Sequence, residues 1–149
     1  TVESVDLIRA HRVGSMAIEH EISGLTVRPK LVIPDIQRGG VVGFDAGEFY
    51  PHHNVYWITS DGWNLRALQA LLRSHLVLEQ IRAYSVQLRG GAIRYQARVL
   101  RQVRVPAASK LSSDLITRLT AVAASNNQSA INAAAEEAFA LQWAPTLPS

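Results

Sequence analysis

The sequence predicts a single α+β domain with a mixed or antiparallel sheet and packed helices. Two runs rich in β-branched and aromatic residues, at 30–36 and 54–60, indicate strands. The second half of the chain instead carries leucines at helical spacing and an alanine-rich stretch. Because strands and helices do not alternate as βαβ units, a parallel sheet is not expected. We expect the domain to cover residues 1–149, with its core at 30–106 and C-terminal helices at 109–143.

The first element that the sequence defines is a lysine-led strand at residues 30–36, in which Pro34 marks an edge or the end of the strand. An arginine and two glycines at 38–40 predict a turn into a second strand at 41–44, which makes a hairpin. Residues 54–60 form the clearest strand, and we expect its Tyr56 and Trp57 to be core residues. Residues 4–22 mix apolar and charged side chains without the spacing of a helix or a strand, so the sequence defines no element there.

Helices are expected after the last of these strands. Asn64 can cap a helix in which leucines recur at helical spacing up to Leu76, and this helix continues or restarts as far as Tyr84. Two more helices are predicted close to residues 113–124 and 129–141, before a proline-containing tail.

The stretch at residues 93–105 is ambiguous, since it fits either a short helix or a strand that stops at Pro106. As a helix, it would place Arg94, Arg98 and Arg101 on one face.

Charge is distributed unevenly along the chain, which has thirteen arginines, two lysines and a net charge of +3. Residues 66–110 carry nine basic side chains against the single acid Glu79, a net charge of +8. Residues 1–65 carry −3 and residues 111–149 carry −2. Arginine favours bidentate recognition of phosphates and guanine edges, so nucleic acid is the leading partner, and a solvated basic face without function is the alternative.

Several classes of protein are excluded by composition. The chain has no cysteine, so it has no disulfide framework, thiol nucleophile or thiolate zinc site. It has neither a membrane-spanning apolar run nor a signal peptide, so we expect a soluble cytoplasmic domain. Because the chain starts at Thr1 and its one methionine is Met16, we expect a piece of a longer protein.

Sequence motifs of catalysis are missing. The chain has no G-x-G-x-x-G, Walker, H-E-x-x-H or G-x-S-x-G motif. The adjacent pair His52-His53 has no third metal ligand nearby, and Asp45 and Glu48 are interpreted as surface charge. We therefore predict no catalytic, metal-binding or cofactor-binding residue in this chain.

A short glycine segment concentrates the groups that a DNA contact requires. Arg89 and Arg94 flank two glycines, and Tyr95 adds an aromatic face. An ordinary glycine turn with incidental arginines is the alternative, but the regional charge favours DNA. The predicted DNA-binding residues are Arg82, Arg89, Gly90, Gly91, Arg94, Tyr95, Arg98 and Arg101.

The order of motifs resembles the C-terminal specificity domain of TaqI-type N6-adenine DNA methyltransferases, which are bacterial modification enzymes. The resemblance covers residues 30–106: KLVIPDI, the glycine turn, GFDAGEFY, YWIT, LLRS, GGAIRY and VRVP follow in the family's order. It implies a TaqI-like specificity domain that binds double-stranded DNA sequence-specifically. It also implies an upstream catalytic domain of the same chain that uses S-adenosylmethionine, within a restriction-modification system.

The catalytic part of that family is missing from this sequence. The family holds the flipped adenine with an Asn/Asp-Pro-Pro-aromatic loop, and none of the six prolines here is followed by another. We therefore expect this chain alone neither to bind the methyl donor nor to methylate. The alternatives are the recognition half of a type I restriction specificity subunit, a protein-interaction module for an acidic partner, and an independent enzyme.

Overall fold

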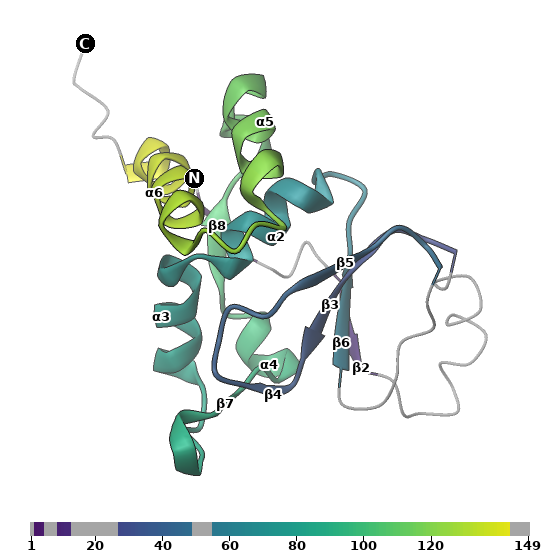
Figure 1. Cartoon of the computed structure of the whole chain (residues 1–149), viewed down its shortest axis with the longest axis vertical. Helices are drawn as coiled ribbons and strands as arrows, with labels where there is room; N and C mark the ends of the chain where they lie inside the picture. The colour runs from purple at the N-terminus through teal and green to yellow at the C-terminus, as the bar shows by residue number, and fades with distance from the viewer. Residues whose placement is uncertain (1, 5–8, 13–26, 49–54, 144–149) are drawn as a thin grey trace.

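The computed structural model describes residues 2–4, 9–12, 27–48 and 55–143 of the chain. Helices gather on one side of the molecule and a small antiparallel sheet lies on the other (Figure 1). This arrangement confirms the predicted α+β class. Because neighbouring strands run antiparallel throughout the described ladders, the structure contains no βαβ crossover in the described residues.

The main sheet has the strand order β2–β6–β3–β5. Its strands are β2 (Arg9–Arg12), β3 (Lys30–Pro34), β5 (Gly43–Asp45) and β6 (Val55–Thr59). The predicted hairpin is confirmed, since β3 pairs with β5, although the second strand starts at Gly43. Tyr56 and Trp57 are buried as predicted. Neighbours along a strand point to opposite faces, so both faces of β6 are covered by other parts of the protein.

An ion pair inside the sheet explains the lysine that begins β3. Lys30 is fully buried and binds the carboxylate of Asp45, its partner in the ladder with β5. The interpretation of Asp45 as surface charge is therefore wrong. An opposite charge at the register position compensates for the cost of burying the ammonium group.

Two short ladders complete the β structure. β1 (Val2–Ser4) pairs with β8 (Arg104–Pro106), and β4 (Ile36–Gln37) pairs with β7 (Ile93–Arg94). β3 ends at Pro34 as predicted, and the chain bends at Asp35 before β4 begins. The bend separates the β4–β7 ribbon from the main sheet.

Helices α2 (Leu65–Arg73) and α3 (His75–Tyr84) are separate but consecutive. The Asn64 side chain caps α2 as predicted, and accepts hydrogen bonds from two backbone N–H groups. Ser74 ends α2 and starts α3: its N–H donates to Leu71, and its hydroxyl accepts from Val77. The helix therefore restarts rather than continues.

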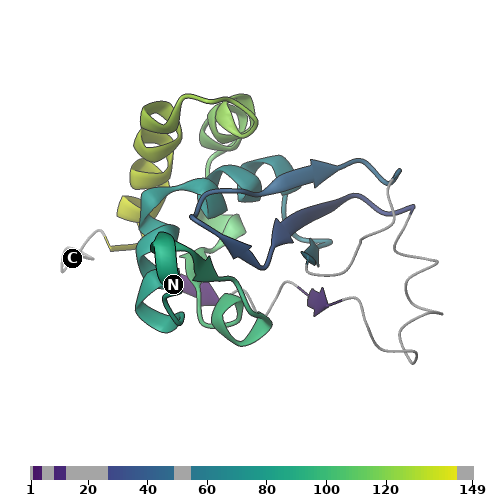
Figure 2. The ribbon, with the colours of Figure 1, turned by 60° about the horizontal axis from the view of Figure 1, so that its bottom comes forward.

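The two predicted C-terminal helices are confirmed as α5 (Ser113–Val122) and α6 (Gln128–Trp143), and they lie side by side (Figure 2). A one-turn 3-10 helix, η4 (Ala108–Lys110), precedes them. Their inner faces contribute Leu115, Leu119 and Phe139 to the core shared with α2 and the sheet. The predicted tail at 144–149 lies outside the described residues.

The ambiguous stretch after residue 92 forms three elements. It contributes β7, the short helix α4 (Ala97–Leu100) and β8, so the single helix face with three arginines is wrong. Arg94 lies in a strand, Arg98 lies inside α4, and Arg101 caps its C-terminal end. The physical reason is strand pairing: β7 pairs with β4 and β8 pairs with β1, so the backbone N–H and C=O groups at both ends of the stretch form inter-strand rather than helical hydrogen bonds.

The described helices include none long and apolar enough to cross a membrane. No group of three or more His, Asp or Glu side chains within the described residues could hold a metal ion. His52-His53 lie outside those residues.

Candidate nucleic-acid interface

The glycine segment forms the tip of a hairpin loop, residues 85–95, which we name the arginine loop. The hydroxyl of Ser85 donates to the carbonyl of Arg94 (2.7 Å) and accepts from its N–H (2.9 Å), which closes the base of the loop. Further out, the N–H of Leu88 donates to the carbonyl of Ala92 (2.8 Å). The arginine loop is therefore a hydrogen-bonded hairpin with a defined conformation.

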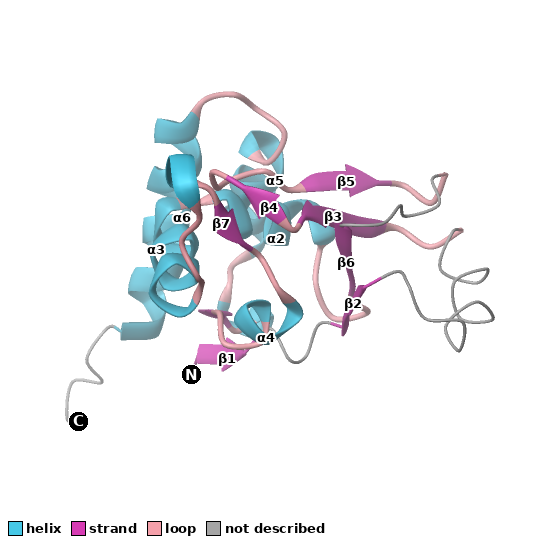
Figure 3. Ribbon diagram, turned by 90° about the horizontal axis from the view of Figure 1, so that it is seen from below, coloured by secondary structure: helices cyan, strands magenta, loops and turns pink. Residues whose placement is uncertain are grey.

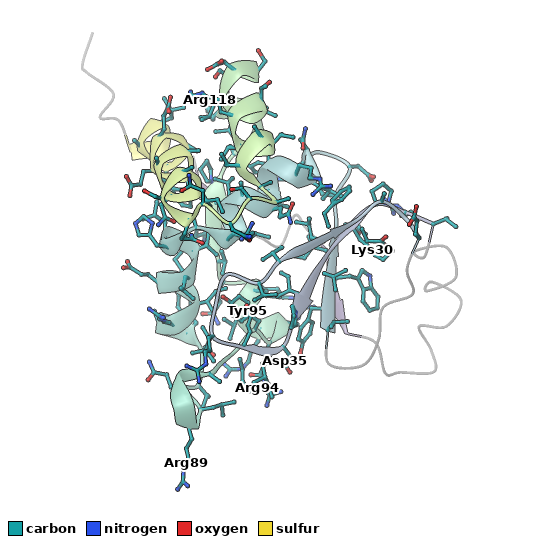
Figure 4. All side chains as sticks on the ribbon, viewed as in Figure 1. Lys30, Asp35, Arg89, Arg94, Tyr95 and Arg118 are labelled. Atoms are coloured by element: carbon teal, nitrogen blue, oxygen red, sulfur yellow. The ribbon has the colours of Figure 1, made fainter. Side chains whose placement is uncertain are left out.

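The tip of the arginine loop is the 3-10 turn η3 (Arg89–Gly91). Gly90 and Gly91 have φ angles of 79° and 81°, which glycine adopts without the steric cost of a Cβ. Arg89 is exposed and extends from the end of the molecule (Figure 4). The two glycines thus turn the chain so that a guanidinium stands at its outermost point.

Arg94 holds the arginine loop to the bend between β3 and β4. Its Nη2 donates to Oδ2 of Asp35 (2.7 Å) and its Nε to Oδ1 (3.3 Å). The Asp35 side chain is 3% exposed and that of Arg94 is 30% exposed. The hydrogen bonds and the charge of Asp35 raise the pKa of Arg94. Arg94 is thus engaged by a buried carboxylate, and its predicted DNA contact stays a prediction.

Tyr95 is a core residue, which corrects the expectation that it offers an aromatic face to DNA. Its side chain is 1% exposed, and its hydroxyl accepts a hydrogen bond from the N–H of Gly40 (3.3 Å). Alternation along the extended chain explains the difference from its half-buried neighbours, Arg94 and Gln96, because successive side chains point to opposite faces. The ring supports the glycine turn at 38–40 from below.

Four more arginines of the basic segment 66–110 are exposed, namely Arg82 on α3, Arg98, Arg101 and Arg104. Among the residues that the structure describes, none of them forms an ion pair. Arg98 donates only to the neutral side chain of Gln96 (3.2 Å). Their charges are therefore available to an anionic partner.

Arg118 on α5 shows the opposite behaviour. It contacts Glu137 (2.6 Å) and Asp114 (3.0 Å), and these carboxylates raise its pKa while its hydrogen bonds lower that of Glu137. Arg118 and Arg89 lie at opposite ends of the molecule (Figure 4). Thus Arg118 is neutralised at one end, whereas Arg89 at the other end forms no ion pair with any residue that the structure describes.

Arg38 belongs to the same surface although the sequence did not indicate it. It is exposed in the turn after β4, and one of its guanidinium nitrogens lies 4.0 Å from where a Cβ would stand at Gly90. Charge counted along the chain places Arg38 in a net acidic block, so no sequence signal pointed to it. The fold brings it beside the arginine loop.

Two other basic residues of the charged block serve the fold. The guanidinium of Arg66 lies 4.1 Å from the centre of the Phe44 ring. Arg73 donates to the carbonyls of Gly40, Ala123 and Ser125. The high net charge of residues 66–110 therefore overstates what a partner can contact.

Comparison with known proteins finds similarity to type II methyltransferases. No family model matches the chain. It is 40% identical over 124 residues to the type II methyltransferase M.PaeR7I of Pseudomonas aeruginosa, which covers 83% of this chain and 22% of that protein. It is 37% identical over 127 residues to M.XhoI of Xanthomonas vasicola, covering 85% of this chain and 23% of that protein.

A third relative, the type II methyltransferase M.BstVI of Geobacillus stearothermophilus, is 42% identical over 92 residues, covering 62% of this chain and 16% of that protein. The chain thus spans about a fifth of the length of the curated relatives it matches. It is homologous to one segment of type II methyltransferases.

Proposed function

We propose that this chain is the DNA target-recognition part of a type II, adenine-specific methyltransferase, and that it binds double-stranded DNA sequence-specifically. The observation that carries the proposal is the arginine loop, which projects Arg89 from one end of the fold. Within the described residues, Arg89 and the exposed Arg82, Arg98 and Arg101 form no ion pair. The similarity to segments of type II methyltransferases supports the enzyme class. Adenine specificity rests on the resemblance to TaqI-type enzymes.

The geometry suits a duplex for a simple steric reason. The major groove of B-DNA admits a two-stranded ribbon, and a hairpin with a small glycine tip is such a ribbon. Arginine can bind the O6 and N7 atoms of guanine with two hydrogen bonds, whereas the surrounding guanidinium groups can bind phosphates. We assign base contact to Arg89 and phosphate contact to Arg82, Arg98 and Arg101.

Methyl transfer belongs, in this proposal, to the remainder of such an enzyme. Because no two prolines are adjacent in the chain, it lacks the loop by which amino-methyltransferases hold a flipped adenine. We therefore derive no step of the transfer from these residues. The chain positions the duplex while the catalytic part acts.

Fluorescence anisotropy tests the proposal with a target duplex selected from a random-sequence pool, since a base contact of Arg89 is measurable only at a fixed sequence. Arg89→Ala is expected to weaken binding by about 1–3 kcal/mol if Arg89 contacts a base, and loss of a phosphate contact lowers the salt slope by about 1. Arg118→Ala is the matched control, since it removes the same charge at the opposite end of the molecule. This control is expected to bind as the unaltered protein does.

Titration of heparin and of the duplex, each at low and at moderate salt, distinguishes DNA recognition from binding to any polyanion. Preference for the duplex, with a steep salt dependence, supports the proposal. Equal binding to heparin and DNA, or equal losses in the Arg89 and Arg118 variants, contradicts it. A protein-interaction module for an acidic partner would then be favoured.

A further inference from the structure

The arginine loop extends the two-stranded β4–β7 ribbon by an isolated antiparallel bridge. Gln87 bridges Ile93 in antiparallel fashion, and Ile93 also pairs with Gln37 of β4. Figure 3 looks at this end of the molecule and shows β4 and β7 side by side. The ribbon therefore runs from residues 36–37 through 93–94 to 86–88.

The two faces of this ribbon differ in burial. Directly opposed residues of an antiparallel pair project to the same face, and neighbours along a strand alternate. One face therefore carries Ile93 and Gln37, which are 2% and 8% exposed. Gln87, at the edge, lies beyond the core and is exposed.

Alternation along the chain assigns Arg94, its ladder partner Ile36, and the two neighbours of Gln87, Val86 and Leu88, to the opposite, outer face. Ile36 is 58% exposed, Val86 55% and Leu88 36%. Three apolar side chains thus face solvent on one small ribbon, where alternation would ordinarily place polar groups. Folding gains nothing from this exposure, which indicates a binding surface.

We propose that the outer face of this ribbon reads thymine, with Ile36, Val86 and Leu88 contacting thymine methyl groups in the major groove. The inference rests on the proposed function and adds to it the side chains that determine specificity. Apolar side chains discriminate thymine through its C5-methyl group, which no other base of DNA presents in the groove. Arg89 at the tip of the same ribbon can donate hydrogen bonds to a neighbouring guanine.

Charge selects DNA over a protein as the occupant of this face. The three apolar side chains lie on the ribbon whose tip carries Arg89, and Arg38 stands beside that glycine tip. An apolar partner surface would have to bury these guanidinium groups, at a cost that a duplex avoids by supplying phosphates. An apolar face among arginines therefore fits a DNA groove.

Removal of single methyl groups from the DNA tests the proposal with the full-length protein. A target duplex is first selected from a random 30-base-pair pool, and each thymine is then replaced by deoxyuridine, which lacks only the methyl group. Loss of one buried methyl group, about 0.8 kcal/mol, corresponds to about fourfold weaker binding. We expect such a loss at one or more thymines.

Variants of the outer face then locate the contact. In Val86→Ala and Leu88→Ala, the thymine duplex is expected to bind more weakly and the deoxyuridine penalty at the contacted position to disappear. Leu141→Ala is the control, since Leu141 is a similarly exposed leucine on α6. It is expected to leave both affinity and penalty unchanged. Because Val86, Leu88 and Leu141 are all exposed, these three variants should keep the melting temperature of the unaltered protein.

Three outcomes are decisive against the inference. Equal affinity for thymine and deoxyuridine duplexes overturns it while sequence-specific DNA binding stands. A deoxyuridine penalty that persists in Val86→Ala, Leu88→Ala and Ile36→Ala assigns thymine recognition elsewhere. If selection from the random pool yields no target duplex, both the proposed function and this inference are contradicted.

Discussion

Arg94 and Tyr95 are neighbours in the sequence, but they have different roles in the structure. The Arg94 side chain is 30% exposed and paired with Asp35, while Tyr95 is 1% exposed and lies under the glycine turn. The sequence groups them because both types occur at DNA contacts. Only the direction of each side chain separates a group that can meet DNA from one that supports the loop.

Tyr95→Phe should lower the free energy of unfolding by about 1 kcal/mol at neutral pH, because it removes the hydroxyl that accepts a hydrogen bond from the N–H of Gly40. Burial raises the pKa of Tyr95 above 10.0, so the folded state favours the neutral phenol. This contribution to stability is complete below pH 10.0 and is lost as pH rises through the folded pKa. The phenylalanine variant should therefore lose less stability than the unaltered protein between pH 9 and about pH 11.

Urea unfolding at these two pH values measures both effects. Tyr84→Phe is the control, because Tyr84 is 45% exposed and its ring lies outside the core. If Tyr95→Phe and the unaltered protein lose stability equally in alkali, the burial of a neutral phenol is not what stabilises this site.

At the scale of elements, the turn at residues 38–40 joins β4 to the segment that leads into β5. Gly39 has a φ of 118°, and a Cβ there would stand 2.4 Å from Cδ1 of Leu78. Leu78 can move, because its methyl groups end a flexible side chain, but the backbone angle cannot be relieved without changing the turn.

Gly39→Ala is expected to destabilise the fold by about 1–3 kcal/mol through backbone strain. Gly43→Ala is the matched control, since its Cβ would meet only the carbonyl oxygen of Val32 at 3.8 Å. We expect that control to change stability by less than about 0.5 kcal/mol. Chemical denaturation of both variants measures the difference, and equal stabilities would show that the turn relaxes without cost.

At the scale of the whole molecule, Arg73 connects parts that are distant in sequence. From the end of α2 it donates to Gly40 in the turn and to Ala123 and Ser125 in the connection between α5 and α6. Gln128 of α6 donates in return to the carbonyl of Arg73 (2.9 Å). The helical layer and the strand layer therefore share one guanidinium.

Arg73→Ala leaves three carbonyl oxygens without this donor, and we expect a loss of about 2–4 kcal/mol in the free energy of unfolding. Arg66→Ala on the same helix removes an arginine whose guanidinium contacts the Phe44 ring and donates a long hydrogen bond to Gln69 (3.4 Å), so it should cost only about 0.5–1 kcal/mol. Hydrogen exchange should show faster exchange in α5 and α6 of the Arg73 variant. Equal protection in the two variants would contradict the connecting role.

Local signals in the sequence determined the α+β class, the strands around residues 31–33 and 56–59, the Asn64 cap, the C-terminal helices and the basic middle region. Each depends on residues close together in the chain, so composition and periodicity carry it. The tertiary structure alone decided that residues 93–106 divide into three elements, that Tyr95 is buried and that Arg38 stands beside Gly90. These outcomes come from pairing across long separations, as between Asp35 and Arg94, which are 59 positions apart. Such pairing depends on which distant backbone and side-chain groups the folded chain brings together, and no local period encodes that choice.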